Sequence, residues 1–205
     1  MTNHGRSTDI QNEEIEAPRR KRWTRNEYHQ IGDMGLLPGR YELIDGEILE
    51  RMPNNPPHRI AVILLAAWLE SIFGRLFVQS QSSIVTPVPD EVSTEPEPDI
   101  AVTRAPTTSY LTDNPGPADL LLVGEVSDTS LNYDLRDKAN LYGASGIQEF
   151  WVLDLNGRKL YIHRLPSPDG YREVRVFGED EQVATLLQPT HRVLVSSLLP
   201  PAVQN

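Results

Sequence analysis

Residues 118–127 have the sequence ADLLLVGEVS, an apolar run that is interrupted near its end by the acidic residue Glu125. A nearly continuous apolar run of this length is typical of a strand that is buried on both faces of a sheet. We therefore predict that it is a central strand with helices packed against it. Burying a carboxylate in so apolar a strand is costly unless another group satisfies it, so Glu125 is a candidate site residue.

Three helices are expected along the chain, and each has a residue type that commonly marks a helix end. They cover residues 24–35, 56–73 and 134–144. Thr24 and Glu27 have the capping-box spacing that begins a helix, and Gly74 is a natural stop for the second helix. That helix is apolar on nearly all sides, so we expect it to be buried.

The remaining segments are predicted to be strands, because β-favouring residues lie between turn signals. The expected strands are 77–86, 99–103, 118–127, 147–155, 159–164 and 171–177, and residues 41–50 form a hairpin. The hairpin turns at Asp45-Gly46, a pair typical of two-residue turns. This order predicts an α/β fold of the mixed α+β type, with a central mixed sheet flanked by helices.

Composition limits the classes of protein to which the chain can belong. Its 205 residues fit one domain, expected over residues 23–205. Residues 1–22 are expected to be a disordered tail, whose basic cluster at 19–22 either contacts phosphate or is simply solvated. The chain has no cysteine, which excludes disulfides and thiolate metal sites, so any metal ligands are oxygen or imidazole.

Charge and hydropathy bear on location and partners. The N-terminus lacks the apolar run of a signal sequence, and the apolar stretch 60–69 is too short to span a bilayer, so we expect a cytoplasmic protein. The net charge is −10, and from Asn26 onward 13 basic residues face 25 acidic ones. This balance of −12 opposes long-range attraction to a polyanion unless a bound cation reverses the field locally.

Two carboxylates interrupt otherwise apolar strands. Asp99 begins the strand 99–103, and Glu125 lies near the end of 118–127. If these strands are neighbours the carboxylates converge, and two charges about 4 Å apart repel by about 4 kcal/mol at an effective dielectric constant of 20. A bound cation is the simplest remedy, and oxygen ligands with room for water suit Mg²⁺ or Mn²⁺. Glu97 would point to the same side and is an alternative ligand.

Lys138 lies in the helix after Glu125 and is one of three lysines in the chain. A compact ammonium near a phosphate oxygen or an attacking water would favour hydrolysis. Asp134 and Tyr142 lie four residues before and after it, where Asp134 could fix the lysine and Tyr142 could line the site. The same spacing also fits an ordinary surface ion pair between Asp134 and Lys138.

These residues resemble the motifs of a known family, the Uma-type restriction endonucleases of the PD-(D/E)XK nuclease superfamily. The resemblance covers about residues 23–198 and rests on six motifs in the same order. They are Tyr41-Glu42-Leu-Ile-Asp-Gly-Glu47, His58 at a helix start, Glu97-Pro98-Asp99-Ile100, Gly124-Glu125-Val-Ser127, Asp134-x-x-x-Lys138-x-x-x-Tyr142, and Gly146-Ile-x-Glu149-Phe-Trp151-Val-x-Asp154.

The resemblance implies a restriction-endonuclease-like core that hydrolyses DNA phosphodiester bonds with Mg²⁺, or with Mn²⁺ in its place. It implies that Asp99 and Glu125 are catalytic metal ligands and that Glu42 lies near the metal. At one position the chain departs from the superfamily pattern, because Ser127 stands where the lysine usually lies. Lys138 is then a catalytic lysine relocated to the adjacent helix.

The resemblance also leaves several assignments open. His58, Asp134 and Tyr142 are candidate substrate contacts, although His58 could equally cap a helix and Tyr142 could be a packing residue. Glu42 lies in an acid-rich hairpin where exposure to solvent is the default. Since nucleases of this family commonly pair to cut two strands, a homodimer is expected.

Two other functions use the same residues. The first is a non-catalytic oligomeric interaction module that keeps a vestigial nuclease fold, which the −12 balance favours. The second is a metal-dependent hydrolase of a small phosphate ester, which would need the same ligands.

Overall fold

The computed structural model describes residues 18–51, 55–88 and 92–202. Its centre is a six-stranded mixed sheet in the order β3-β4-β5-β6-β7-β8, which confirms the predicted fold class. The strands of this sheet are β3 (Val78–Ser80), β4 (Ile100–Thr103), β5 (Leu120–Ser127), β6 (Glu149–Asp154), β7 (Lys159–Ser167) and β8 (Gly170–Gly178). Neighbours run antiparallel except β5 and β6, which are parallel.

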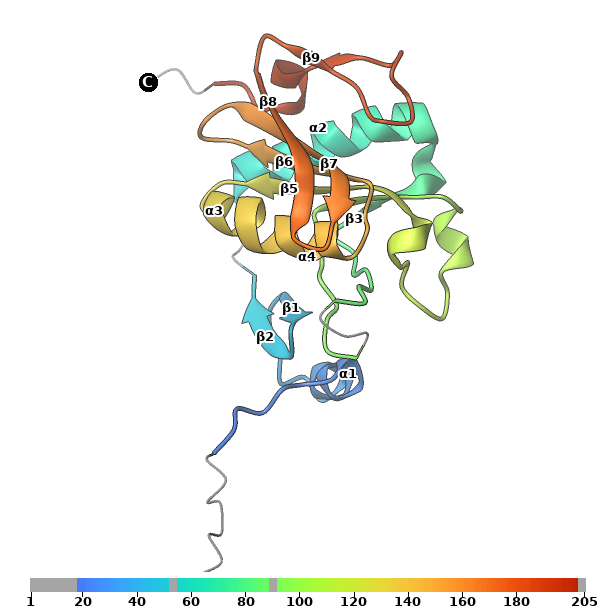
Figure 1. Ribbon diagram of the computed structural model, residues 1–205, viewed down its shortest axis with the longest axis vertical. Coiled ribbons are helices and arrows are strands. Elements are labelled where there is room, and N and C mark those ends of the chain that lie inside the picture. Colours follow the sequence, from blue (N-terminus) through green and yellow to red (C-terminus); the bar gives the residue numbers. More distant parts are fainter. Residues whose placement is uncertain (1–17, 52–54, 89–91, 203–205) are drawn as a thin grey trace, which may run out of the picture.

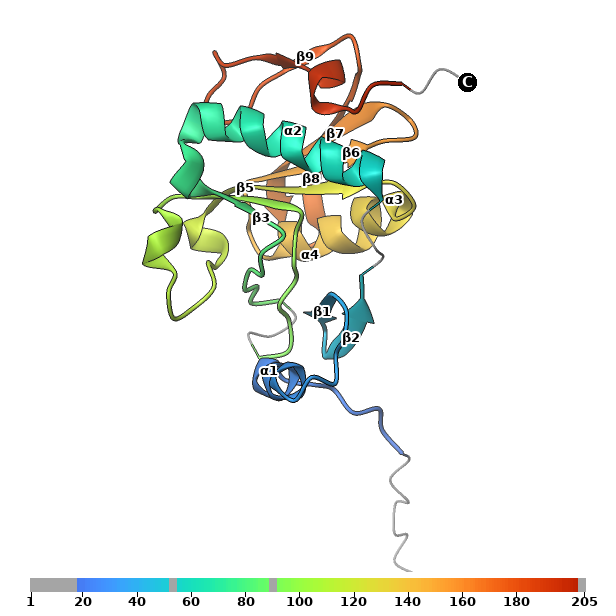
Figure 2. The same cartoon turned by 180° about the vertical axis from the view of Figure 1, so that it is seen from behind.

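Helices cover both faces of the sheet. Figures 1 and 2 show α2 along one face and the α3–α4 segment across the other. The helices are α1 (Arg25–Asp33), α2 (Pro56–Phe73), α3 (Leu131–Tyr133), a π-helical segment (Asp134–Lys138) and α4 (Ala139–Ala144), with short 3-10 turns at Arg75–Phe77, Thr107–Ser109, Pro117–Asp119 and Val195–Leu198. No helix in the described ranges has the length and hydropathy that crossing a bilayer requires.

Strand β5 is buried on both faces, as its apolar run predicts. Leu122 packs in the core on the α2 side, and the next residue, Val123, packs in the core on the α4 side. Successive side chains of a strand point to opposite faces, so a strand between two cores must be apolar at both.

The pairing of β4 with β5 brings the two predicted acids together. Ile100 lies opposite Gly124 in this antiparallel pair. Asp99 precedes Ile100 and Glu125 follows Gly124, so the register places the two carboxylates side by side at one end of β4.

The predicted hairpin is confirmed as β1 (Tyr41–Ile44) and β2 (Glu47–Glu50). Asp45 and Gly46 both have positive φ, 49° and 75°, as a type I′ turn requires. In Figure 1 the hairpin lies between α1 and the main sheet. A bridge between Leu43 and Glu95 ties it to the loop before β4. A second small pair, β9 (Gln182–Val183) and β10 (Val193–Leu194), lies near the C-terminus.

Three predicted boundaries were wrong by three residues or more. The strand expected over 77–86 ends at Ser80, where the next residue, Gln81, leaves the extended region with a φ of 52°. The strand expected over 159–164 continues to Ser167, opposite β8. The third helix begins at Leu131 instead of residue 134.

Much of the predicted tail, 1–22, lies outside the described residues, which begin at 18. Within the described part, Nζ of Lys21 lies 2.6 Å from Oε1 of Glu27, and Arg22 pairs with Asp45 at the hairpin turn. The predicted capping box at Thr24 is confirmed at the start of α1.

Candidate active site

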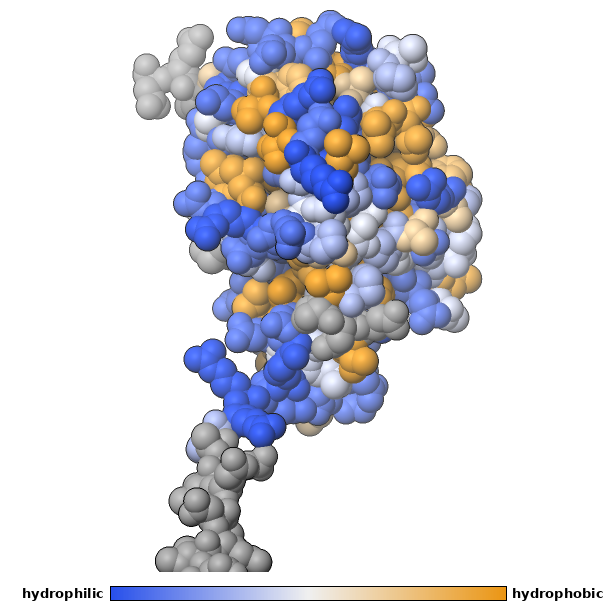
Figure 3. Space-filling model, in the orientation of Figure 1, coloured by the Kyte–Doolittle hydropathy of each residue, from blue (hydrophilic) through white to orange (hydrophobic). Residues whose placement is uncertain are grey.

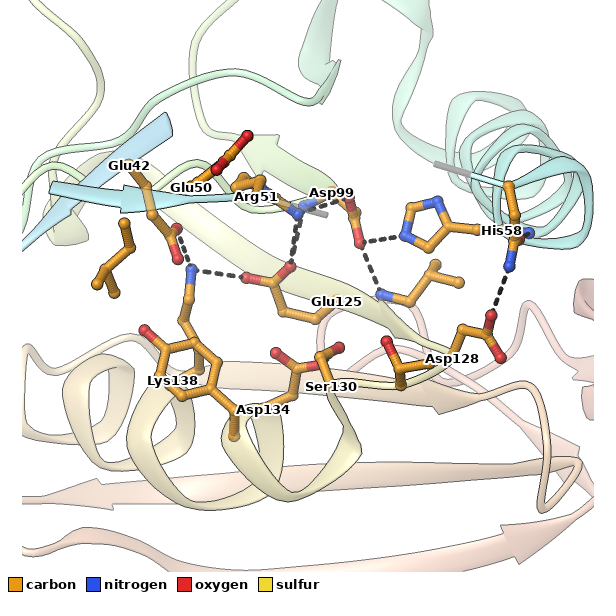
Figure 4. Close-up of a pocket in the computed structure, with 15 residues that line it drawn as sticks. Glu42, Glu50, Arg51, His58, Asp99, Glu125, Asp128, Ser130, Asp134 and Lys138 are labelled. Carbon is orange, nitrogen blue, oxygen red and sulfur yellow. Dashed lines mark hydrogen bonds and ion pairs between the residues drawn. The ribbon is translucent and has the colours of Figure 1, made fainter. Parts of the chain in front are cut away.

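A cavity of about 470 Å³ lies where the hairpin, the start of α2, the ends of β4 and β5, and the α3 segment meet (Figure 4). Six of the predicted site residues line it: Glu42, His58, Asp99, Glu125, Asp134 and Lys138. The seventh, Tyr142, does not line the cavity but contacts a residue that does, since its hydroxyl donates a hydrogen bond of 3.0 Å to Oε1 of Glu125.

Backbone groups of the sheet hold the two central carboxylates. The N–H of Asp99 donates to Oε2 of Glu125 at 3.3 Å, and the N–H of Val126 donates to Oδ2 of Asp99 at 2.9 Å. Both side chains are almost completely buried, with exposed fractions of 1% and 3%. The two acids are therefore fixed by the strands and not by mobile side chains.

Arg51, which follows β2, lies between these two acids. Its Nη2 atom is 3.0 Å from Oδ1 of Asp99 and 3.7 Å from Oε2 of Glu125. Its Nη1 atom is buried and has no hydrogen-bond partner among the described residues. The guanidinium thus offsets the repulsion that the sequence predicted between the acids, at the position where a metal ion was expected.

The environment separates the pKa values of the two acids. Burial alone would raise the pKa of Asp99, but the hydrogen bond with His58 and the charge of Arg51 outweigh it and lower the pKa. Burial dominates at Glu125 and raises its pKa to about 7, against the opposing charges of Lys138 and Arg51. At neutral pH Asp99 is ionised, while Glu125 is close to its titration midpoint.

Lys138 is delivered to the cavity by the π-helical segment. Its Nζ atom lies 2.5 Å from Oε2 of Glu42 and 3.3 Å from Oε1 of Glu125. Burial alone would lower the pKa of Lys138, but Glu125 and Glu42 outweigh it and raise the pKa above its usual value. The lysine is a fixed ammonium ion. The predicted alternative of a surface pair is wrong for Lys138, because its side chain is 3% exposed.

His58 and Asn55 enter from the first turn of α2. The Nε2 atom of His58 lies 3.1 Å from Oδ2 of Asp99, while its Nδ1 atom is buried without a partner in the described structure. Asn55 caps the helix by accepting a hydrogen bond from the N–H of His58, and its amide donates to Asp128 at 2.5 Å. His58 therefore positions Asp99, and the predicted capping role falls to Asn55.

Two expectations about neighbouring acids were wrong. Asp134 does not fix Lys138. Instead, the carboxylate of Asp134 accepts hydrogen bonds from the hydroxyls of Ser127 and Ser130, at 2.5 and 2.6 Å. Glu97, the alternative ligand, lies outside the cavity and pairs with Arg40, although its N–H donates to Glu42 at 3.2 Å.

The sequence did not point to Arg51, Asn55, Asp128 or Tyr133, which also line the cavity. Arg51 had one usable signal, since it directly follows a predicted strand. Asp128 directly follows β5 and could have been found by the rule that polar residues gather where strands end.

The carboxylates of Asp99 and Glu125 match in kind the ligands that a divalent cation requires. Mg²⁺ is commonly held by one or two carboxylates, and water and phosphate complete its shell. Asp99 and Glu125 supply this pair, so the residues fit in kind. No group of three or more acidic or histidine side chains within the described residues is arranged as a metal site, and Arg51 fills the space between the pair. A cation would therefore have to displace the arginine.

Comparisons with known proteins identify a family and a shared fold. A family model described as "Uma2: Putative restriction endonuclease" matches residues 25–195. Among solved structures, a protein from Anabaena variabilis described as a putative nuclease matches with a TM-score of 0.58 and 14% identity, covering 82% of this chain and 96% of its own. At that identity the similarity shows a shared fold. No curated protein matches the chain.

Proposed function

Because the chain belongs to the Uma2 family, whose description is that of a restriction endonuclease, we propose that it is a Mg²⁺-dependent endonuclease that hydrolyses DNA phosphodiester bonds. The observation that carries the proposal is the convergence of Asp99, Glu125 and Lys138 at one end of the sheet, inside a cavity that solvent can reach. Two acids and a cation at this spacing can hold a metal and a phosphate side by side.

In the proposed reaction, Asp99 and Glu125 hold the cation, which would lower the pKa of an attacking water and offset charge on the phosphate. Lys138 remains charged because two carboxylates raise its pKa, so it supplies positive charge to the phosphate and is a poor base. Glu42 holds the ammonium in place. Once displaced from the acids, Arg51 provides a second cationic contact for phosphate.

The charge of the cavity supports a dependence on metal. Six acids and two permanent cations line it: Glu42, Glu50, Asp99, Glu125, Asp128, Asp134, Arg51 and Lys138. This excess of acids repels a phosphodiester unless a divalent ion is bound first. We therefore expect DNA to bind weakly without metal.

The test is a cleavage assay on double-stranded, single-stranded and branched DNA with Mg²⁺ or Mn²⁺. Asp99→Asn should reduce cleavage by at least about 100-fold, since it removes a ligand. Glu97→Gln is the matched control, because it changes a nearby carboxylate outside the cavity, and it should cleave within a few-fold of wild type. Cleavage that survives Asp99→Asn, or no cleavage of any substrate, contradicts the proposal.

A second candidate, a non-catalytic interaction module, is favoured by one observation. Arg51 pairs with Asp99 and lies beside Glu125, so a cation from the chain itself already offsets the charge of the two acids. A vestigial site of this kind needs no metal, and calorimetric titration with Mn²⁺ would then show no binding in wild type or in Glu125→Gln.

A further inference from the structure

Strand β8 forms an open edge of the sheet. Among the described residues it pairs only with β7, and it presents nine residues, Gly170–Gly178, along its other side. The opposite edge, β3, has only three residues. A long open edge exposes unpaired N–H and C=O groups, which readily accept another strand.

Two apolar side chains of β8 are half exposed on this open edge. Val174 and Val176 are each 49% exposed. They lie opposite His163 and Tyr161 of β7, which places them on the α4 side of the sheet. Figure 3, in the orientation of Figure 1, shows apolar and charged residues interspersed over the face where β8 lies. Half-exposed valines beside open backbone groups favour a strand partner.

The charges on β8 are arranged in a self-complementary way. Glu173 and Arg175 lie on either side of Val174 and form an ion pair of 2.5 Å within the chain. If two β8 strands pair antiparallel about a two-fold axis through Val174, Glu173 of each copy lies opposite Arg175 of the other. Opposite charges directly across an antiparallel pair are stabilising, and like charges are destabilising.

Other registers lack this complementarity. A two-fold axis perpendicular to the sheet must pass through a residue, because side chains of facing residues share one face. An axis through Arg172, Glu173 or Arg175 places that charge opposite its own copy. Val174 is also the midpoint of Gly170–Gly178, so an axis there pairs all nine residues.

We propose that β8 is a homodimer interface, in which two copies join antiparallel about Val174 into one continuous sheet. The charges that usually protect an edge strand from aggregation here select one partner and one register. Val174 of one copy meets Val174 of the other on the same face, and Val176 lies opposite Arg172 of the other copy. The proposal does not depend on the function of the cavity.

The first experiment measures molar mass by light scattering across a dilution series. Wild type should be a dimer. Glu173→Arg and Arg175→Glu should each dissociate at least tenfold more readily, because each places like charges opposite each other. An equimolar mixture of the two variants should recover dimers, since each charge again faces its opposite. Circular dichroism confirms that each variant is folded.

The second experiment uses the absence of cysteine from the sequence. Val174→Cys should form a disulfide-linked dimer under mild oxidation, because facing Cα atoms lie about 4.5 to 5.5 Å apart. Arg172→Cys is the control, since residue 172 lies about 14 Å from its own copy in this register and cannot be linked.

Dimers that follow this charge pattern and link at position 174 support the proposal. It is overturned if wild type is monomeric throughout the dilution series, if the single charge variants dimerise as strongly as wild type, or if Arg172→Cys links as readily as Val174→Cys.

Discussion

The Nη2 atom of Arg51 lies 3.0 Å from Oδ1 of Asp99, in a contact that is almost completely buried. The arginine comes from the hairpin and the aspartate from the main sheet, 48 positions later. The guanidinium of Arg51 thereby occupies the side of Asp99 that a bound metal ion would contact. If the proposed metal binds between the two acids, it must displace this ion pair, which makes Arg51 the most informative position for mutation.

Removing the arginine should strengthen metal binding. We expect Arg51→Gln to bind Mn²⁺ about tenfold more tightly than wild type by calorimetry, a difference of about 1.4 kcal/mol, because the ion no longer displaces a paired cation. Without metal the variant should lose about 3 kcal/mol of stability, since the two buried acids lose the cation between them and keep only His58 and Lys138 as partners. Arg40→Gln, which removes the partner of Glu97 outside the cavity, should leave the affinity unchanged. Weaker binding by Arg51→Gln would show that the arginine assists the metal.

Metal binding should also depend on pH through Glu125. Because burial raises the pKa of this carboxyl to about 7, a metal ion must displace its proton below that pH. The affinity for Mn²⁺ should rise by about tenfold per pH unit from pH 5.5 to 6.5 and level off above pH 8. Calorimetry in buffers of different ionisation enthalpy should detect the released proton. An affinity that is flat over this range would mean that Glu125 is already ionised or is not a ligand.

Lys138 should serve both stability and cleavage, and the two can be separated. Lys138→Met leaves Glu42 without its cation and Glu125 with only the more distant Arg51, so we expect a loss of about 3 to 5 kcal/mol in urea unfolding. Adding Glu42→Gln removes one of the unpaired charges and should restore part of that stability. Cleavage should stay at least about 100-fold below wild type in both variants. Recovery of cleavage in the double variant would assign Lys138 a structural role only.

His163 provides a test away from the cavity. It is buried against Phe150, and burial lowers its pKa to about 4, whereas the unfolded chain takes up this proton near pH 6.5. Between these values the unfolded state binds more protons, so stability falls as the pH falls. Wild type should lose on the order of 1 to 2 kcal/mol more than His163→Phe between pH 7 and pH 4.5. Equal losses in urea unfolding would contradict the burial of a neutral imidazole.

The sequence predicted best what depends on neighbours along the chain. The hairpin at Asp45-Gly46 and the cap at Thr24 are set by a few adjacent residues. The central strand β5 was found because its apolar run exceeds what a strand with one exposed face would show. Asp99 and Glu125 were found because they interrupt such runs.

What depends on distant contacts was missed. Apart from its place directly after a predicted strand, nothing in the sequence around Arg51 marks it, and its partners lie 48 and 74 positions away. The wrong role for Asp134 has a different origin: the helical spacing suggested Lys138, but the actual partners, Ser127 and Ser130, lie only seven and four positions before it. The depth of burial that shifts the pKa of Glu125 is also a property of the whole fold.

The hairpin described above supplies Glu42 and, just after it, Arg51, while the main sheet and its helix supply Asp99, Glu125 and Lys138. If the hairpin is not docked, the chain keeps Asp99 and Glu125. It loses the ion pair that holds Lys138 and the arginine that lies between the two acids. During synthesis, the cavity cannot be completed until residue 138 has emerged from the ribosome and the hairpin has docked. The proposed site is therefore assembled only when two parts of the chain that lie 96 positions apart have folded against each other.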